Sequence, residues 1–349
     1  RSLKRSTMDP KKKIIITGGT GYIGSHTSLA LIQEGFDVVI VDDLSNSEAS
    51  VLDRIAELSK GVKPQFEKID LSNFEHAYNF LKKHSDACGV INFAAFKAVG
   101  ESVQKPLVYY RNNLSILINI LECMQEFNMT NFIFSSSATV YGIPNQLPIT
   151  EDEPTKRPTS PYGNTKKIGE EILDDFSRNQ PMFSAISLRY FNPIGAHPSG
   201  KLGESPVGIP NNLMPFITQT ASGIREELKV FGKDYKTKDG TNIRDYIHVV
   251  DLAEAHVLAL KRLLNKTAKD NFEIFNIGTG IGYSVLDVIT SFERTTKQKL
   301  NYSFTDRRQG DVPELFADST KANQLLNWQA KFNLDDMTSS SWNFQNAKK

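Results

Sequence analysis

This sequence predicts an α/β fold with a doubly wound parallel sheet, because short apolar segments alternate with helical segments through its first half. The spacing of apolar residues predicts helices over 22–34, 73–83, 106–127 and 161–178. The strands expected between them are 13–17, 37–41, 65–69, 89–93, 131–134 and 183–188. Turn residues separate these segments, as expected where strands and helices alternate.

The first three elements form one βαβ unit. Residues 13–17 are a short apolar run that stops at glycines, and residues 22–34 place Ile23, Leu29 and Ile32 at helical spacing. Residues 37–41 form the second strand, which ends at Asp42 and Asp43. The unit spans about 30 residues, the usual length of this motif.

Loop residues become frequent after Arg189, and helices predicted over 249–264 and 284–295 then alternate with short strands. We therefore expect a tail over residues 1–12, a larger domain over 13–190, and a smaller lobe over 191–349. Some segments of this smaller α/β lobe are expected to return to the larger domain. The residues before Met8 show no periodicity, so we place them outside the fold.

The overall charge points away from macromolecular partners. The 349 residues carry 41 basic and 40 acidic side chains with the two signs interspersed, which favours neither nucleic acid nor an anionic membrane. No apolar run reaches the roughly 18 residues that span a bilayer. Cys88 and Cys123, the two cysteines, lie beside apolar neighbours, which favours a reducing compartment. We expect a cytoplasmic protein that acts on a small molecule.

A glycine turn follows the first strand. Gly18, Gly21 and Gly24 lack side chains at positions where backbone N–H groups and a helix N-terminus can approach a pyrophosphate. Glycines between a strand and a helix also form simple tight turns, so the turn alone leaves two interpretations open. Asp42 ends the next strand, 18 residues after Gly24, where a carboxylate accepts the ribose hydroxyls of NAD. Together they predict an NAD-binding Rossmann domain over 13–190.

A second group of residues predicts proton-transfer chemistry. Tyr162 and Lys166 lie four residues apart on a predicted helix and therefore share one of its faces. Lowering the pKa of a phenol from about 10 to about 7 requires roughly 4 kcal/mol. We expect Lys166 and the positive nicotinamide ring to supply this stabilisation. The product would be a general base suited to hydroxyl oxidation.

Ser137 strengthens this interpretation. It closes the run 135–137 after a predicted strand, at the sheet edge where ligands bind. A hydrogen-bonded strand end is the alternative explanation of these serines. Tyr78 and Lys82 have the same spacing as Tyr162 and Lys166 but no serine partner, and we interpret them as part of a solvated helix face.

Six segments carry a resemblance to a known family. The chain resembles the UDP-glucose 4-epimerases of the extended short-chain dehydrogenase/reductase family, from about residue 13 to the last helix. The segments are 17–27 (TGGTGYIGSHT), 97–103 (KAVGESV), 132–142 (FIFSSSATVYG), 188–193 (LRYFNP), 208–215 (GIPNNLMP) and 244–249 (RDYIHV).

The resemblance implies a reaction: interconversion of UDP-glucose and UDP-galactose through a 4-keto intermediate, with tightly bound NAD as the transient hydride acceptor. Tyr162 would be the general base, Lys166 would lower its pKa, and Ser137 would assist the proton relay. The implied NAD contacts are Gly18, Gly21, Tyr22, Ile23, Gly24, Asp42, Asp43, Asn46, Asp70, Leu71, Phe93, Ala94, Lys97, Asn112, Tyr162, Lys166 and Phe191. The implied UDP-sugar contacts are Lys97, Ser137, Tyr162, Asn192, Asn212, Leu213, Phe231, Arg244, Arg308 and Asp311. It also suggests a homodimer through helices near 106–127 and 163–178.

Three alternative functions remain at this point. A sugar-nucleotide 4,6-dehydratase needs an acid and a base after the strand-end serine, where this chain has Ala138 and Thr139. A non-catalytic NAD sensor has no need for Ser137, Tyr162 and Lys166 together, and a net dehydrogenase would release reduced cofactor in each turnover.

Two further expectations concern metals and substrate size. None of the six histidines has a cysteine or carboxylate at the spacing typical of metal ligands, so we expect no catalytic metal. Leu315 falls where side-chain bulk limits the sugar pocket in the family. Its intermediate size leaves the acceptance of N-acetylated sugars undecided, and we expect the non-acetylated pair to be preferred.

Overall fold

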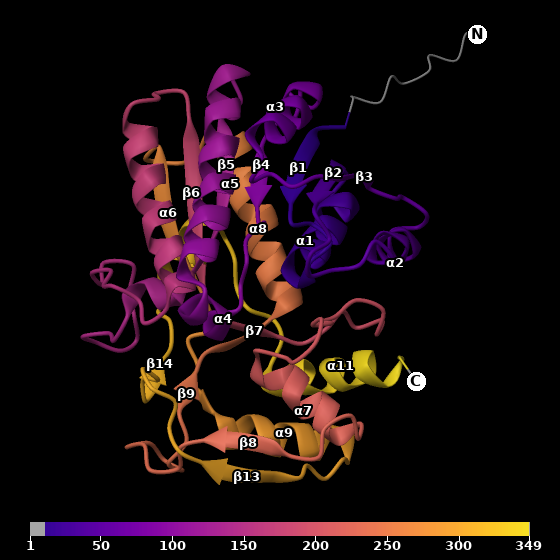
Figure 1. Ribbon diagram of the computed structural model, residues 1–349, viewed down its shortest axis with the longest axis vertical. Helices are drawn as coiled ribbons and strands as arrows, with labels where there is room; N and C mark the ends of the chain where they lie inside the picture. The colour runs from indigo at the N-terminus through magenta and orange to yellow at the C-terminus, as the bar shows by residue number, and fades with distance from the viewer. Residues whose placement is uncertain (1–10, 349) are drawn as a thin grey trace.

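A seven-stranded parallel sheet forms the centre of the computed structural model, which describes residues 11–348 (Figure 1). The strand order is β11-β6-β5-β4-β1-β2-β3. The bounds are β1 Lys13–Thr17, β2 Asp37–Asp42, β3 Gln65–Lys68, β4 Val90–Asn92, β5 Asn131–Ser137, β6 Ser184–Tyr190 and β11 Phe272–Ile277. The fold class predicted from the sequence is therefore confirmed. Residues 1–10 of the predicted tail lie outside the described residues.

Helices cover both faces of this sheet. The alternation of side chains along a strand places Ile14 and Ile16 in one apolar cluster and Ile15 in another. The first cluster contains residues of α1 (Tyr22–Gln33), α2 (Val51–Leu58) and α8 (Val249–Leu264). The second contains residues of α3 (Phe74–Lys83), α5 (Pro106–Glu126) and α6 (Pro161–Arg178). Apolar burial on both faces accounts for the consecutive apolar residues of β1 (KIIIT) and β2 (DVVIVD).

The strand order contains a switch point. From β1 the chain builds outward through β2 and β3, and it then returns to place β4 on the other side of β1. In open α/β sheets, ligands bind at the carboxyl ends of the strands where the order reverses. The turn after β1 and the loop after β4, which contains the short helix α4 (Val99–Gln104), both lie at this point.

A smaller lobe adjoins the carboxyl end of β6. Two short parallel strands, β7 (Asn192–Ile194) and β10 (Tyr246–His248), connect it to the sheet layer. Its other strands are β8 Leu228–Phe231 with β13 Tyr302–Thr305, and β9 Ile243–Arg244 with β12 Tyr283–Ser284 and β14 Glu314–Leu315. Its helices include α7 Leu213–Ala221, α9 Val285–Thr296 and α11 Leu334–Asn346. The remaining short helices are η1 Ala138–Tyr141, after β5, and α10 Thr320–Leu325, which packs near β11.

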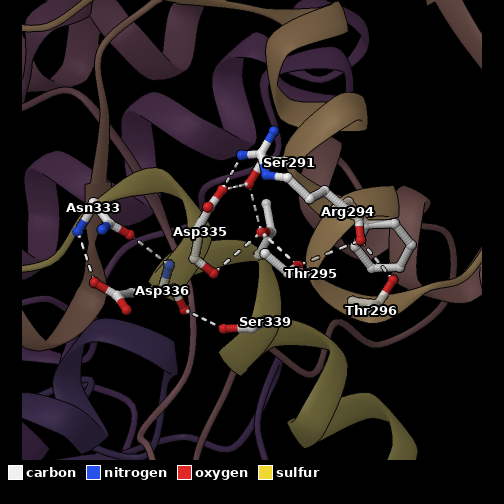
Figure 2. Close-up of polar contacts among 10 residues, drawn as sticks. Ser291, Arg294, Thr295, Thr296, Asn333, Asp335, Asp336 and Ser339 are labelled. Carbon is white, nitrogen blue, oxygen red and sulfur yellow. Dashed lines mark hydrogen bonds and ion pairs between the residues drawn. The ribbon is translucent and has the colours of Figure 1, made fainter.

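Helix α11 is fixed to α9 by polar contacts at its first turn (Figure 2). Asn333 and Asp336 form a reciprocal capping box that begins α11. Asp335, in the same turn, accepts hydrogen bonds from Ser291 (2.7 Å) and Arg294 of α9. Among residues 11–348, no helix has both the length and the apolar character that a bilayer crossing requires.

Candidate active site

The glycine turn between β1 and α1 is packed too closely for side chains. Gly18 has a φ of +70°, and its N–H donates to the carbonyl of Val41 (2.8 Å), which ties the turn to β2. A Cβ on Gly24 would lie 2.3 Å from the carbonyl oxygen of Gly18. Within residues 11–348, no side chain caps the amino end of α1. N–H groups at an uncapped helix start are suited to bind an anion such as a pyrophosphate.

Asp42 and Asp43 have different roles at the end of β2. The carboxylate of Asp42 accepts hydrogen bonds from the backbone N–H of Thr20 (3.3 Å) and of Leu44 (3.0 Å), and so reaches across to the glycine turn. Asp43 instead accepts from the N–H and the hydroxyl of Ser45 within its own loop. The position of Asp42 beside the turn suits a partner of ribose hydroxyls.

The other predicted cofactor residues follow neighbouring strands. Asp70 and Leu71 come after β3, Phe93, Ala94 and Lys97 after β4, and Phe191 after β6. Phe93 is buried against the ring of His256, and the N–H of Ala94 donates to the hydroxyl of Thr17 (3.2 Å). Because β1 to β6 are adjacent in the sheet, their carboxyl ends share one edge. The remaining predicted contacts are Tyr22 and Ile23 in α1, Asn46 in the loop after β2, and Asn112 on α5.

Tyr162 and Lys166 lie together at the start of α6. The hydroxyl of Ser160 caps this helix by accepting from the N–H of Gly163 (3.1 Å). The ammonium nitrogen of Lys166 lies 5.9 Å from the centroid of the Tyr162 ring and donates to the carbonyl of Ser135 on β5 (2.7 Å). The helix face predicted from the spacing is thus directed at the end of β5.

Ser137 is the last residue of β5. Its hydroxyl oxygen accepts from the N–H (3.2 Å) and the hydroxyl (3.1 Å) of Thr139, and so caps η1. Both interpretations of the serines therefore have support: Ser137 is a hydrogen-bonded strand end, and it lies two residues beyond the carbonyl that holds Lys166.

Burial controls the electrostatics of Tyr162 and Lys166. It raises the pKa of Tyr162 well above the usual value of a phenol, and the nearby hydroxyls of Tyr190 and Tyr109 add to this effect. Burial, together with the charge of Lys97, lowers the pKa of Lys166 to about 7, and Glu170 opposes both effects. The polypeptide alone therefore keeps the phenol protonated, and Lys166 by itself does not produce a phenolate.

Four predicted substrate residues gather in the smaller lobe. Arg308 donates to Asp311 (3.0 Å), and its guanidinium carbon lies 5.0 Å from the ring centroid of Phe231. Arg244 donates to the carbonyls of Ile243 and Val312, both at 2.8 Å. Burial lowers the pKa of Arg244, as does the charge of Arg308, while Tyr246 and Asp311 raise it. Two guanidinium groups whose charges act on each other have the chemistry to bind an anion.

Other predicted substrate residues lie at the starts of a strand and a helix in the same lobe. Asn192 begins β7 and Leu213 begins α7. Asn212 precedes α7, and its amide donates to the carboxylate of Glu204 (2.6 Å). Leu315 pairs with Arg244 between β14 and β9 and packs in one apolar cluster with Phe191.

Several residues with functional positions were not predicted. The hydroxyl of Ser102 on α4 accepts from the N–H of Tyr162 (3.1 Å), and Asn113 on α5 donates to Thr165 (3.2 Å) on α6. Glu204 is half-buried near Lys97, and desolvation raises its pKa to about 7. These contacts join residues far apart in the chain, and no local pattern indicates them.

Curated relatives match this chain over nearly its full length. The UDP-glucose 4-epimerase of Bacillus subtilis (strain 168) is 49% identical over 96% of this chain and 97% of its own. That of Mus musculus is 47% identical over 96% of both chains. The chain belongs to the UDP-glucose 4-epimerase family. This membership confirms the resemblance seen in the sequence and the prediction that the protein is an enzyme of the epimerase class.

Solved structures of this epimerase family have the same fold. The UDP-glucose 4-epimerase of Stenotrophomonas maltophila, with bound NAD and formylated UDP-arabinopyranose, superposes with a TM-score of 0.92 at 43% identity, covering 97% of this chain and 98% of its own. That of Bifidobacterium longum, in complex with NAD⁺ and UDP, gives 0.91 at 43% identity, covering 96% and 98%. These epimerases therefore hold the cofactor predicted from the glycine turn.

A family model described as GDP-mannose 4,6 dehydratase matches residues 15–340. Dehydratase chemistry needs an acid and a base after the strand-end serine. In this epimerase-family chain Ala138 and Thr139 stand there, and Thr139 donates to Ser137.

Among the described residues, no cluster of three His, Cys, Asp or Glu side chains is arranged to hold a metal ion.

Proposed function

We propose that this protein interconverts UDP-glucose and UDP-galactose through a 4-keto intermediate, with NAD bound throughout the cycle. One observation carries the proposal: Lys166, beside the ring of Tyr162, donates to the end of β5 at the same sheet edge as the glycine turn. Membership of the epimerase family supports the choice of reaction.

The cofactor would be held by the turn and the strand ends around it. Gly18, Gly21 and Gly24 leave room for a pyrophosphate at the uncapped amino end of α1, and Asp42 would accept from ribose hydroxyls. When bound, NAD supplies a hydride acceptor and a positive charge.

Tyr162 would remove the proton of the sugar 4-hydroxyl and later return it, with Ser137 assisting this transfer. Because burial keeps the phenol protonated in the polypeptide alone, the phenolate requires positive charge nearby. Lys166 supplies one such charge when it is protonated. Its pKa of about 7 makes that protonation sensitive to its surroundings near neutral pH.

The arginine pair in the smaller lobe would bind the diphosphate of the substrate. Arg308 is oriented by Asp311, and Arg244 by two backbone carbonyls, so both guanidinium groups are fixed before an anion arrives. The amides of Asn192 and Asn212 would donate to sugar or phosphate oxygens. Leu213 and Phe231 would contact the nucleotide part of the substrate, and Lys97 would contact its sugar.

Replacing Arg308 with glutamine is expected to raise the KM for UDP-galactose by about 10-fold or more, since a charge-assisted hydrogen bond to an anion contributes roughly 1.5–3 kcal/mol. The matched control is Arg307→Gln. Arg307 is the adjacent residue, pairs with Asp234 and is exposed to a similar degree. Steady-state kinetics of both variants tests the assignment, which an equal rise in KM for the two would contradict.

Incubation of the purified protein with UDP-galactose, without added NAD, tests the function itself. The expected result is an equilibrium mixture of UDP-galactose and UDP-glucose, and ion-exchange chromatography separates and quantifies the two. Accumulation of NADH in place of UDP-glucose would instead indicate a net dehydrogenase, and failure to react with or without added NAD would contradict the proposal.

We also propose a homodimer formed through α5 and α6, in the cytoplasm. Apolar side chains remain exposed on α5 and on the adjoining α4, with Leu107 78% and Val103 59% exposed. Such a surface favours a protein partner. Cys88 and Cys123 are both free, and burial raises the pKa of each thiol to about 11, in keeping with a reducing compartment.

A further inference from the structure

Glu170 continues the helix face that carries the two proposed catalytic residues. Tyr162, Lys166 and Glu170 follow one another at intervals of four along α6. The side chain of Glu170 is only 6% exposed, and its partner Arg189 on β6 only 4%. A buried carboxylate next to a proposed catalytic lysine requires an explanation.

Both oxygens of Glu170 are hydrogen-bonded from the sheet. Arg189 donates through Nε at 3.1 and 3.0 Å, and through Nη2. The hydroxyl of Ser136 on β5 donates at 2.6 Å, and that of Ser187 on β6 at 2.9 Å. The carboxylate therefore fixes α6 to two neighbouring strands at once.

The same stretch of β5 also holds Lys166. The carbonyl of Ser135 accepts from the ammonium, and the hydroxyl of the next residue, Ser136, donates to Glu170. Ser137, the residue assigned to proton relay, comes directly after them. Contacts to Glu170 and Lys166 thus fix the register of α6 on β5 immediately beside the reacting groups.

Among residues 11–348, the charged and titratable groups that act on this pair come from the loop after β4 and from α6, β6 and η1. Lys166 faces Lys97 from the loop after β4, Tyr162 from its own helix, and Glu170. Glu170 in turn faces Arg189 from β6 and Tyr141 from η1. Lys97 and burial both favour a neutral Lys166, and the carboxylate of Glu170 is the group that favours the ammonium.

We propose that Glu170 is a positioning residue of this epimerase: held by Arg189 and Ser136, it fixes α6 on β5 and sets a negative charge one helical turn from Lys166. This inference rests on the proposed function, since it concerns the same proton-transfer site. Glu170 does not touch the reacting atoms and acts through Lys166.

A purely structural ion pair is the competing explanation, and the chain contains a matched example. Arg262 on α8 and Glu273 on β11 are 7% and 4% exposed and form two bonds of 2.8 and 2.9 Å. This pair also joins a helix to a strand of the same sheet, and it is not among the groups that influence Lys166. Glu273→Gln therefore reproduces the loss of a buried ion pair without the effect on the site.

The test compares Glu170→Gln with Glu273→Gln in the protein as purified. Lysine labelled with ¹³C at Cε reports the pKa of Lys166 by NMR titration, and the signal that disappears in Lys166→Arg identifies it. We expect Glu170→Gln to lower this pKa by roughly 1 unit. The proposed role of Lys166 requires its ammonium form, so the alkaline limb of kcat/KM should move to lower pH by the same amount. Glu273→Gln should leave both quantities unchanged while lowering the thermal midpoint to a similar degree.

Glu170→Gln leaves Arg189 buried and unpaired, which can unfold the protein. A double variant that removes both charges keeps the experiment informative in that case. Glu170→Gln with Arg189→Gln removes both charges and is expected to lower the pKa of Lys166 in the same direction by a smaller amount. Its control is Glu273→Gln with Arg262→Gln. An unshifted pKa of Lys166 in the folded variants would overturn the inference, as would an equal shift in the controls. A wild-type protein that fails to epimerise would contradict the proposed function alone, since the NMR titration does not depend on turnover.

Discussion

Tyr162→Phe is expected to lower kcat for UDP-galactose by about 10²–10⁴-fold, the usual contribution of a general acid or base. The substitution removes only the phenolic oxygen and keeps the ring, which lies 5.9 Å from the ammonium of Lys166. The helix start should be unaffected, because Ser102 accepts from the backbone N–H of Tyr162 and Ser160 caps through Gly163. KM should therefore change by only a few-fold.

The chain supplies a matched control for this experiment. Tyr78 stands four residues before Lys82 on α3, and its ring packs 5.0 Å from that of Phe127. Tyr78→Phe removes an equivalent hydroxyl at the same spacing from a lysine, and is expected to leave kcat unchanged. Steady-state kinetics together with bound NAD content separates chemistry from binding. Wild-type turnover by Tyr162→Phe would refute the assignment of the base.

Gly24→Ala is expected to abolish retention of NAD and to destabilise the fold by about 1–3 kcal/mol, as overpacking usually does. The new Cβ would lie 2.3 Å from the carbonyl oxygen of Gly18 and 2.9 Å from the Cα of Gly19. All of these atoms are backbone, so the turn and α1 would have to separate. The NAD released on denaturing the purified protein and the unfolding midpoint in urea measure the two effects.

Gly100→Ala provides the comparison for that variant. Gly100 also lies within a helix, α4, but a Cβ there would meet no atom within 4 Å. Alanine is favoured over glycine in helices by roughly 1 kcal/mol, so this variant should be as stable as the parent or slightly more so. It should also retain NAD. Full NAD content in Gly24→Ala would show that the turn tolerates a side chain and does not hold the pyrophosphate closely.

Most of the sheet was predictable because strands such as β1, β2 and the first half of β5 are local apolar runs. The strand over 272–277 also has a local pattern, but its pairing with β6, far back in the chain, follows only from the tertiary structure. Helices α2 and α4 were not predicted: α2 buries only Leu52 and Ile55, and α4 has six residues and contains a glycine. β5 continues through three serines because Ser136 donates to Glu170 on α6 and Ser135 shares a hydrogen bond with Tyr190 of β6. The sequence does not reveal these contacts.

In the candidate site, too, residues set by local patterns were predictable and tertiary contacts were not. Residues at strand ends and the pair on α6 were predictable, because strand order and helical spacing bring them to one edge. The contact of Glu170 with Arg189, 19 residues away, and that of Ser102 with Tyr162, 60 residues away, were not. The electrostatic state of Tyr162 was also beyond the sequence, since it depends on how deeply the fold buries the phenol.

Two short strands link the sheet layer directly to the smaller lobe. β7 follows β6, β10 runs into α8, and the two strands pair in parallel, with Asn192 opposite Tyr246 and Ile194 opposite His248. Arg244, which we propose to bind the substrate diphosphate, lies two residues before β10. One residue inserted into either strand would shift its pairing by about 3.3 Å and reverse the direction of every following side chain in that strand. The register of this short pair therefore ties the position of the proposed phosphate contacts to that of the sheet edge.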